Sequence, residues 1–258
     1  MYQPHRSLVT GASSGIGEDL ARALARRGSD LVLVARREER LRELAAELTR
    51  DAGVRVEVLP VDLAEPHAGS RLHGLVGGPV DTVVNAAGFG SYGGIVETDP
   101  EVLTGMVDTN VRALVDITRA FLPELIAARG GAIVNVASTA SFQPIPGQAV
   151  YGASKAFVRS FTEAVWWEAK PHGVKVTALC PGVTRTEFFD VVGRELSGGG
   201  PMQTVEQVTA AALRALDRRS TPPVAISGRI NSAFAAGTKL LPRRALIRTA
   251  AQVIGYKG

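Results

Sequence analysis

The chain has 258 residues, of which 45% are hydrophobic, and it carries a net charge of +4. A chain of this size can bury one sizeable core without disulfides or structural metals. Cys180 is the only cysteine, so no intrachain disulfide can form, and its apolar surroundings predict a buried, inert thiol. Basic residues are scattered among acids and only 5% of residues are aromatic, so we expect no nucleic-acid partner.

The apolar stretches all stay short of the roughly 20 uncharged residues that span a bilayer. The opening residues MYQPHRSLVTG also lack the apolar core of a signal peptide. We therefore expect a soluble, cytoplasmic protein.

Apolar, β-branched runs alternate with helical periods along the chain. The expected strands are 7–11, 31–35, 55–62, 82–88, 132–138, 175–182 and 224–227. Each is a continuous apolar run rather than an alternating one, which is typical of a parallel sheet covered on both faces. The pattern predicts an α/β fold: a doubly wound, mostly parallel Rossmann-type sheet with helices on both faces, in a single domain that spans residues 1–258.

Two capping boxes support the expected helices. Thr98 with Glu101 forms the first, with proline in the first turn, and Thr204 with Gln207 forms the second. The second box follows a helix breaker, residues 197–201, which contains three consecutive glycines and a proline.

A glycine-rich loop connects the first expected strand to an amphipathic helix. Its residues are Gly11, Ser13, Ser14, Gly15, Ile16 and Gly17. Glycines allow a tight turn and a close backbone approach to a pyrophosphate, whose charge is met by free N–H groups and the helix dipole. The spacing G-x-x-x-G-x-G predicts a dinucleotide-phosphate site, and the alternative is a tight turn without a ligand.

The second strand ends in Ala35-Arg36-Arg37, where NAD-binding folds place an acid that holds the ribose 2′-hydroxyl. A guanidinium at this point can pair with a 2′-phosphate. The sequence thus predicts that NADP(H) is preferred over NAD(H), with Arg36 as the phosphate partner. In the alternative, these arginines are solvated charges at the start of the next helix, most of all Arg37 and Arg40.

Two further strand ends should face the same crevice. Asp62, followed by Leu63, could accept a hydrogen bond from an adenine amino group, or it could be the N-cap of the next helix. The other strand end offers small side chains for a flat cofactor, with Asn85 bracing the turn, and consists of Asn85, Ala86, Ala87 and Gly88.

Three residues predict the chemistry. Ser138 ends a strand, and Tyr151 and Lys155 stand four apart in a helical run, so that they share one face. A phenol with a reference pKa near 10 transfers protons poorly at neutral pH unless a nearby ammonium stabilises its anion. Ser138 would hydrogen-bond the substrate oxygen as negative charge develops there. Taken alone, a tyrosine and a lysine at this spacing are usually an exposed pair.

The motifs TGASSGIG and NAAG, then Asn110, Ser138 and YGASK, resemble in this order the short-chain dehydrogenase/reductase family over nearly the whole chain. The resemblance implies that Asn110, Ser138, Tyr151 and Lys155 form the catalytic set, with Asn110 holding a water relay to Lys155. It also implies that Tyr151 and Lys155 contact the cofactor, that Asp62 meets the adenine, and that a further turn packs against the nicotinamide, formed by Pro181, Gly182 and Thr186.

We accordingly expect an NADP(H)-dependent oxidoreductase that transfers hydride between nicotinamide and a carbonyl or secondary alcohol, with Tyr151 as general acid and base. Two alternatives are a non-catalytic NADP-binding regulator and an isomerase or dehydratase on the same scaffold. The substrate would be small and apolar, in a pocket lined by Phe142, Gln143, Phe188 and Phe189, under a lid at 187–205 that contains the glycine run. In the alternative, Phe142 and Gln143 belong to a surface loop.

The remaining expectations concern partners. The resemblance implies a homodimer or homotetramer, in which Trp166 and Trp167 either contact another subunit or pack in the core. The C-terminal segment, residues 237–258, mixes basic and apolar residues at helical spacing and predicts a helical extension. We expect it to pack on its own domain with arginines outward, with peripheral membrane contact as a lesser option.

Overall fold

The computed structural model describes residues 1–188 and 201–256. Phe189 and most of the expected lid lie outside the described residues. In the described part, parallel strands form one sheet in the order β3-β2-β1-β4-β5-β6-β7, which confirms the predicted fold class. The strands are β1 (Arg6–Thr10), β2 (Asp30–Ala35), β3 (Val56–Pro60), β4 (Thr82–Asn85), β5 (Ala132–Val136), β6 (Lys175–Cys180) and β7 (Val224–Ile226).

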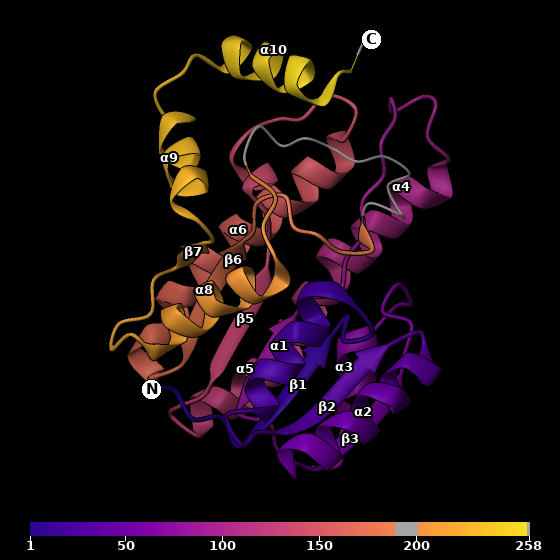
Figure 1. Ribbon diagram of the computed structural model, residues 1–258, viewed down its shortest axis with the longest axis vertical. Coiled ribbons are helices and arrows are strands. Elements are labelled where there is room, and N and C mark those ends of the chain that lie inside the picture. The colour runs from indigo at the N-terminus through magenta and orange to yellow at the C-terminus, as the bar shows by residue number, and fades with distance from the viewer. Residues whose placement is uncertain (189–200, 257–258) are drawn as a thin grey trace.

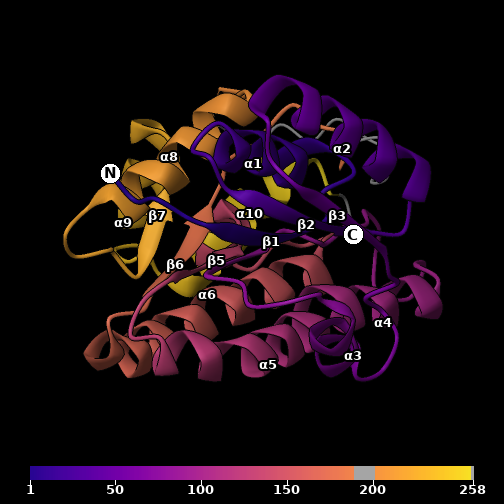
Figure 2. The same ribbon diagram turned by 90° about the horizontal axis from the view of Figure 1, so that it is seen from below.

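Helices cover both faces of the sheet (Figure 2). On one face lie α1 (Gly15–Ala25), α2 (Glu38–Ala52) and α8 (Val205–Asp217). On the other lie α3 (Ala68–Leu75), α5 (Ala113–Ala127) and α6 (Ala149–Ala169). Each layer has its own buried cluster, represented by Leu24 and Leu41 on the first face and by Ile117 and Phe121 on the second. Burial on both faces explains why the strands are continuous apolar runs.

The order of the strands reverses beside β1, which pairs with β2 on one edge and with β4 on the other. The connections that follow β1 and β4 therefore leave toward opposite faces of the sheet. In open α/β sheets this reversal leaves a crevice outside the carboxyl ends of the strands. The expected functional residues after β1, β2, β4 and β5 all border that crevice.

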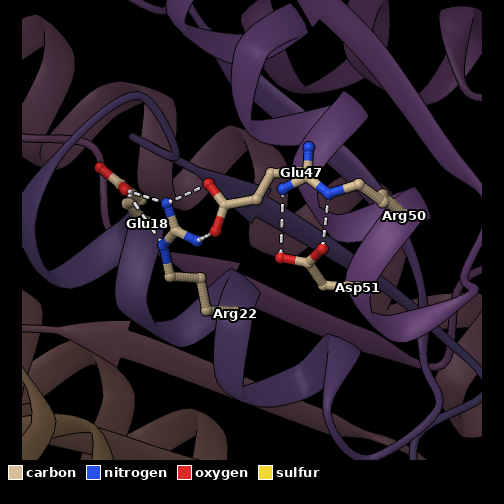
Figure 3. A network of polar contacts seen from close by, with 5 residues as sticks. All are labelled: Glu18, Arg22, Glu47, Arg50 and Asp51. Carbon is tan, nitrogen blue, oxygen red and sulfur yellow. Dashed lines mark hydrogen bonds and ion pairs between the residues drawn. The ribbon is translucent and has the colours of Figure 1, made fainter.

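Charged side chains tie the first two helices together (Figure 3). Arg22 on α1 bonds Glu18 on its own helix at 2.7 Å and also pairs with Glu47 on α2. The carboxylates raise the pKa of Arg22, while a separate pair joins Arg50 to Asp51 at 2.7 Å. Such partly exposed pairs contribute little stability individually. Their geometry nonetheless links α2 to the helix that begins at the glycine loop.

The helical segment before β5 contains a π turn. Helix α4 (Pro100–Val107) continues through the π turn Asp108–Arg112 into α5. The wider turn places the side chain of Asn110 inside the protein, with 1% of its surface exposed. Single π turns inside helices are frequent at functional sites.

One of the two predicted caps is wrong. Helix α4 begins one residue later than the box at Thr98 requires: Asp99 is the N-cap and accepts a 2.8 Å hydrogen bond from the Glu101 N–H. Thr98 instead donates to the carbonyl of Gly94. The box of Thr204 and Gln207 at the start of α8 is confirmed in both of its hydrogen bonds.

The two tryptophans of α6 have different environments. The indole of Trp166 donates to the carbonyl of Thr221 at 2.7 Å and packs against the core, whereas Trp167 is 67% exposed. Core packing thus accounts for the first ring but not for the second.

After β7 the chain forms α9 (Arg229–Gly237) and α10 (Arg243–Ile254), which lie beyond the carboxyl ends of the strands (Figure 1). The described helices include none with the length and apolar character needed to cross a membrane.

Candidate active site

A cavity of about 860 Å³ opens outside the carboxyl ends of the strands. It extends from the glycine loop after β1 to Tyr151 on α6, under the two C-terminal helices. Most of the expected site residues line it: Gly11, Ser13, Ser14, Gly15, Ile16, Gly17, Arg36, Asp62, Leu63, Ala86, Ala87, Gly88, Ser138, Gln143, Tyr151, Lys155, Pro181, Gly182, Thr186 and Phe188. Asn85, Asn110 and Phe142 do not line it.

The glycine loop packs so closely that a side chain is excluded at two of its glycines. A Cβ atom on Gly11, whose φ is +66°, would lie 2.8 Å from the backbone nitrogen of Ala87, and one on Gly17 would lie 2.3 Å from the Gly11 carbonyl oxygen. Thr10 secures this contact, because its hydroxyl accepts hydrogen bonds from the N–H groups of Ala86 and Ala87 at 3.0 and 3.1 Å. The loop thus exposes backbone at the N-terminus of α1, which suits a pyrophosphate.

The two arginines after β2 take different positions. Arg36 lines the cavity and is exposed. Arg37, for which a solvated charge was the alternative interpretation, donates to the hydroxyls of Ser13 at 3.1 Å and Ser14 at 2.7 Å and pairs with Glu187 at 2.8 Å. The pairing with Arg37 lowers the pKa of Glu187. Both guanidiniums therefore lie at the cavity end that the glycine loop borders.

Asp62 and Asn85 have local structural roles. Asp62 lines the cavity and accepts a 2.9 Å hydrogen bond from the N–H of Ala64, while helix α3 has its N-cap at His67. Asp62 thus braces a turn and is not a helix cap. Asn85 is buried below the cavity and donates to the side chain of Asn135 at 2.9 Å, across β4 and β5. This bond joins two strands, and the bracing of the following turn by Asn85 stays a prediction.

Ser138 and Tyr151 meet at the other end of the cavity. Ser138 follows β5 with extended backbone, and its hydroxyl accepts from the N–H of Ala140 at 3.1 Å. Burial raises the pKa of Tyr151, and a hydrogen bond with the Ser138 hydroxyl acts in the opposite direction. The phenol is therefore in its neutral, proton-donating form at neutral pH.

Lys155 lies one helical turn beyond Tyr151 and is buried. Its ammonium group donates to the carbonyl of Val136 at 2.9 Å and lies 5.9 Å from the centre of the Tyr151 ring. Burial lowers the pKa of Lys155 to about 8, so the charged form still predominates at neutral pH. The pair is not the exposed surface pair that its spacing alone would favour.

Asn110 lies behind the cavity wall. Its amide donates to the carbonyl of Phe89 at 2.9 Å and to the hydroxyl of Ser154 at 3.0 Å, and its oxygen accepts from the N–H of Phe89. A Cβ on Gly88 would lie 2.8 Å from Oδ1 of Asn110 and 3.3 Å from Nζ of Lys155. Both polar groups thus border Gly88, and the relay between them stays a prediction.

Of the expected pocket residues, some line the cavity and one lies outside it. Phe188 lies 5.3 Å from the Tyr151 ring, centre to centre, and Gln143 also lines the cavity. Phe142 lies outside it, because its ring packs at the edge of the core with the guanidinium of Arg159 4.4 Å above it.

Cys180 is fully buried, which raises the pKa of its thiol to about 11, in agreement with an inert cysteine.

The C-terminal helices form a roof over the cavity, which we did not expect from the sequence. Phe234 and Ile230 from α9 line it, together with Val253 and Ile254 from α10. The apolar spacing of α10 indicates an inward face. It does not indicate which surface that face covers.

Gln203 connects the roof to the turn after β6. Its buried side-chain oxygen accepts from the Gly182 N–H at 3.3 Å, the Ser227 hydroxyl at 2.6 Å and the Asn231 amide at 3.1 Å. Its backbone pairs with Val183 and Arg185. No motif in the sequence pointed to this glutamine, which holds the Pro181-Gly182 turn and α9 together.

These features agree with the comparisons with known proteins. A model of the family described as short chain dehydrogenase matches residues 6–196, and the chain therefore belongs to the short-chain dehydrogenase/reductase family. It is an oxidoreductase of that family, as its sequence predicted.

The chain is similar to three proteins of known name. Sulfoacetaldehyde reductase 2 of Chromohalobacter salexigens is 43% identical over 192 residues, which cover 70% of this chain and 73% of that protein. A short-chain dehydrogenase from Sphingobium yanoikuyae in complex with NADPH is 36% identical, with a TM-score of 0.79 and coverage of 92% and 94%. The bulky-bulky ketone specific alcohol dehydrogenase from Comamonas testosteroni is 30% identical, with a TM-score of 0.76 and coverage of 93% and 94%.

Proposed function

We propose that the protein is an NADP(H)-dependent oxidoreductase that interconverts an apolar ketone or aldehyde and the corresponding alcohol. One observation carries the proposal: the cavity that contains Ser138, Tyr151 and Lys155 at one end is bordered by a glycine loop and two arginines at the other. The described residues fit a dinucleotide, because the loop offers backbone N–H groups and the arginines offer positive charge.

A bound nicotinamide dinucleotide would supply or accept the hydride. In carbonyl reduction, Tyr151 donates its phenol proton to the substrate oxygen, and Ser138 donates a hydrogen bond to that oxygen as charge develops on it. Lys155 stabilises the resulting phenolate through its buried positive charge. The Val136 carbonyl holds the ammonium group in place at 2.9 Å.

The preference for NADP(H) is supported by the two arginines and by the relative that binds NADPH. Arg36 would hold the 2′-phosphate, because it lines the cavity and no hydrogen bond engages its guanidinium within the described residues. Arg37 is held by Ser13, Ser14 and Glu187 and assists from the side of the loop.

Binding measurements with the two cofactors test this preference. NADPH should bind more tightly than NADH, and Arg36→Ala should lose about 1.5 to 3 kcal/mol of NADPH binding, or about ten- to a hundred-fold, with a much smaller loss for NADH. Arg40→Ala is a matched control, since Arg40 does not line the cavity. Equal affinities of the wild-type protein for NADPH and NADH would refute the preference.

The apolar substrate is supported by the cavity wall around the catalytic end. Phe188 and Ile145 line the cavity, as do the roof residues Phe234, Val253 and Ile254. The relative from Comamonas testosteroni is named for bulky ketones. A panel of carbonyl compounds of increasing apolar size should show rising kcat/KM. The assay follows the oxidation of NADPH at the nicotinamide absorbance band.

The same panel distinguishes the alternatives. Cofactor binding without any turnover would indicate a regulator, and turnover without net oxidation of NADPH would indicate an isomerase or dehydratase.

Phe234→Ala should lower kcat/KM for the bulkiest substrates by about tenfold while sparing the smallest, because a lost apolar contact is worth about 1 to 3 kcal/mol. An equal loss of kcat/KM for substrates of all sizes would mean that Phe234 does not contact the substrate.

A further inference from the structure

Basic residues are scattered among acids over residues 1–217 but not beyond them. All 25 acidic residues lie within residues 1–217, whereas residues 218–258 contain eight lysines and arginines and no acid. The net charge of +4 conceals this difference, because the longer part is acidic overall. The C-terminal part, which includes α9 and α10, is strongly basic.

Four of these bases lie within ten residues of one another in the roof. Lys239 lies in the turn between α9 and α10, and Arg243, Arg244 and Arg248 lie on α10; all four are exposed. None of them forms an ion pair with a carboxylate in the part of the chain that the structure describes. We call these four residues, with Leu240, Leu241 and Ile247, the basic roof surface.

The same surface exposes aliphatic side chains. Leu240 is 86% exposed and Leu241 52%, in the turn that precedes α10, and Ile247 is 38% exposed on the helix between Arg244 and Arg248. These residues do not serve the core or the cavity, because α10 turns a different face inward. Leu246 and Ala250 are buried there, and Val253 and Ile254 line the cavity.

Two adjacent exposed leucines with unpaired cations on both sides of them in the sequence suit the boundary between lipid headgroups and acyl chains. We propose that the basic roof surface docks on an anionic lipid bilayer. Leu240 and Leu241 enter the boundary, while Lys239, Arg243, Arg244 and Arg248 pair with headgroup phosphates. A second copy of the chain is a poorer occupant, because it would bring an equally basic surface against this one.

Docking would also turn the cavity toward the bilayer. Helix α10 carries the arginines of the basic roof surface and also contributes Val253 and Ile254 to the cavity lining, so docking would hold the cavity roof against the bilayer, where apolar compounds dissolve. This consequence rests on the proposed function, whereas the docking does not. Vesicle binding and turnover of a soluble carbonyl compound are therefore measured separately.

Co-sedimentation with vesicles tests the docking. The full chain should bind vesicles of phosphatidylcholine mixed with phosphatidylglycerol, bind pure phosphatidylcholine weakly, and lose affinity as salt is raised. The triple variant Arg243→Gln, Arg244→Gln and Arg248→Gln should bind mixed vesicles about 100-fold more weakly, since each arginine near an anionic surface contributes roughly a fivefold change.

A matched control removes three charges from the opposite end of the molecule. Arg214→Gln, Arg218→Gln and Arg219→Gln change exposed residues at the end of α8 and in the turn after it, where the Arg218 carbonyl accepts from Lys175 at the start of β6. This triple variant should bind mixed vesicles like the wild type. Equal losses in the two triple variants would mean that total charge alone matters, and would overturn the proposal.

The leucines are tested at constant charge. Leu240→Ser with Leu241→Ser should weaken binding to mixed vesicles by at least about tenfold, because apolar transfer is lost. All variants should keep wild-type turnover of a soluble carbonyl compound and wild-type size in gel filtration, which shows that they fold. Absence of vesicle binding by the wild type at low salt, or equal binding to a DNA duplex with the same arginine dependence, would refute the lipid surface.

Discussion

The two walls of the cavity are built by different means. At the strand ends, Ser138 follows β5, and Tyr151 and Lys155 lie on a helix packed on the sheet, with Lys155 buried and bonded to the Val136 carbonyl. The roof consists of α9 and α10, which come after the last strand and meet the rest of the protein through Gln203, the hydrogen bond of Tyr92 to Gly255 and apolar contacts.

This difference separates the tasks of the two walls. A group that transfers a proton must keep its geometry within a fraction of an ångström, and a sheet surrounded by buried side chains provides that rigidity. A wall that accommodates an apolar molecule needs only shape and hydrophobic character. Changes in the first wall should therefore affect chemistry, and changes in the second should affect substrate choice or stability.

The largest expected effect is at the rigid wall. Tyr151→Phe removes the transferable proton but little contact surface, so kcat should fall by at least about 100-fold while NADPH affinity changes by no more than about twofold. Steady-state turnover and a cofactor titration measure the two quantities. Tyr92→Phe is the control, because that hydroxyl bonds the Gly255 carbonyl at the edge of the roof. Wild-type turnover by Tyr151→Phe would refute the assigned acid.

The pH dependence of reduction should report Lys155. Its pKa is lowered to about 8, so the ammonium loses its proton above that pH, whereas Tyr151, with a raised pKa, keeps its own. The value of kcat/KM should be level below pH 8 and fall about tenfold per pH unit above it. Lys155→Arg stays charged and should shift the descending limb upward, whatever its absolute rate. If kcat/KM of the wild-type protein stayed level to about pH 10, the charge of Lys155 would not be needed for the reaction.

Gln203 joins the two walls, and its removal should cost stability. Gln203→Leu leaves the Gly182 N–H, the Ser227 hydroxyl and the Asn231 amide without their acceptor. The free energy of unfolding should drop by about 2 to 4 kcal/mol in denaturant titration. Gln203→Glu keeps an acceptor oxygen and should lose much less. If both substitutions cost the same, the hydrogen bonds are not the reason for the loss.

The rigid wall was largely predictable from the sequence because its signals are local. A parallel strand shows itself as an apolar run, the glycine loop follows β1 directly, and Tyr151 and Lys155 share a helix face by spacing alone. The roles of Arg36 and Arg37 were harder to separate. Which guanidinium turns toward Ser13 and Ser14 depends on backbone angles at the end of the strand, and residue type does not specify these.

The roof was not predictable, for a physical reason. The apolar face of α10 shows that something covers it, but the partner surface lies far away in sequence and is brought there only by the fold. The π turn at Asn110 is a similar case. Hydrophobic periodicity describes α4 and α5 as one helix, and the extra residue that turns Asn110 inward leaves no trace in that period.

The smallest expected effect concerns the helix that leads to this π turn, where the sequence and the structure disagree by one residue. Asp99→Ala should lower the free energy of unfolding by about 1 kcal/mol, because the Glu101 N–H loses its cap, whereas Asp99→Asn keeps an oxygen acceptor and should cost little. Thr98→Val removes only the bond to the Gly94 carbonyl and should cost less than Asp99→Ala. Denaturant titration of the three variants measures these differences. A larger loss for Thr98→Val than for Asp99→Ala would restore Thr98 as the cap, and α4 would then begin one residue earlier than the structure places it.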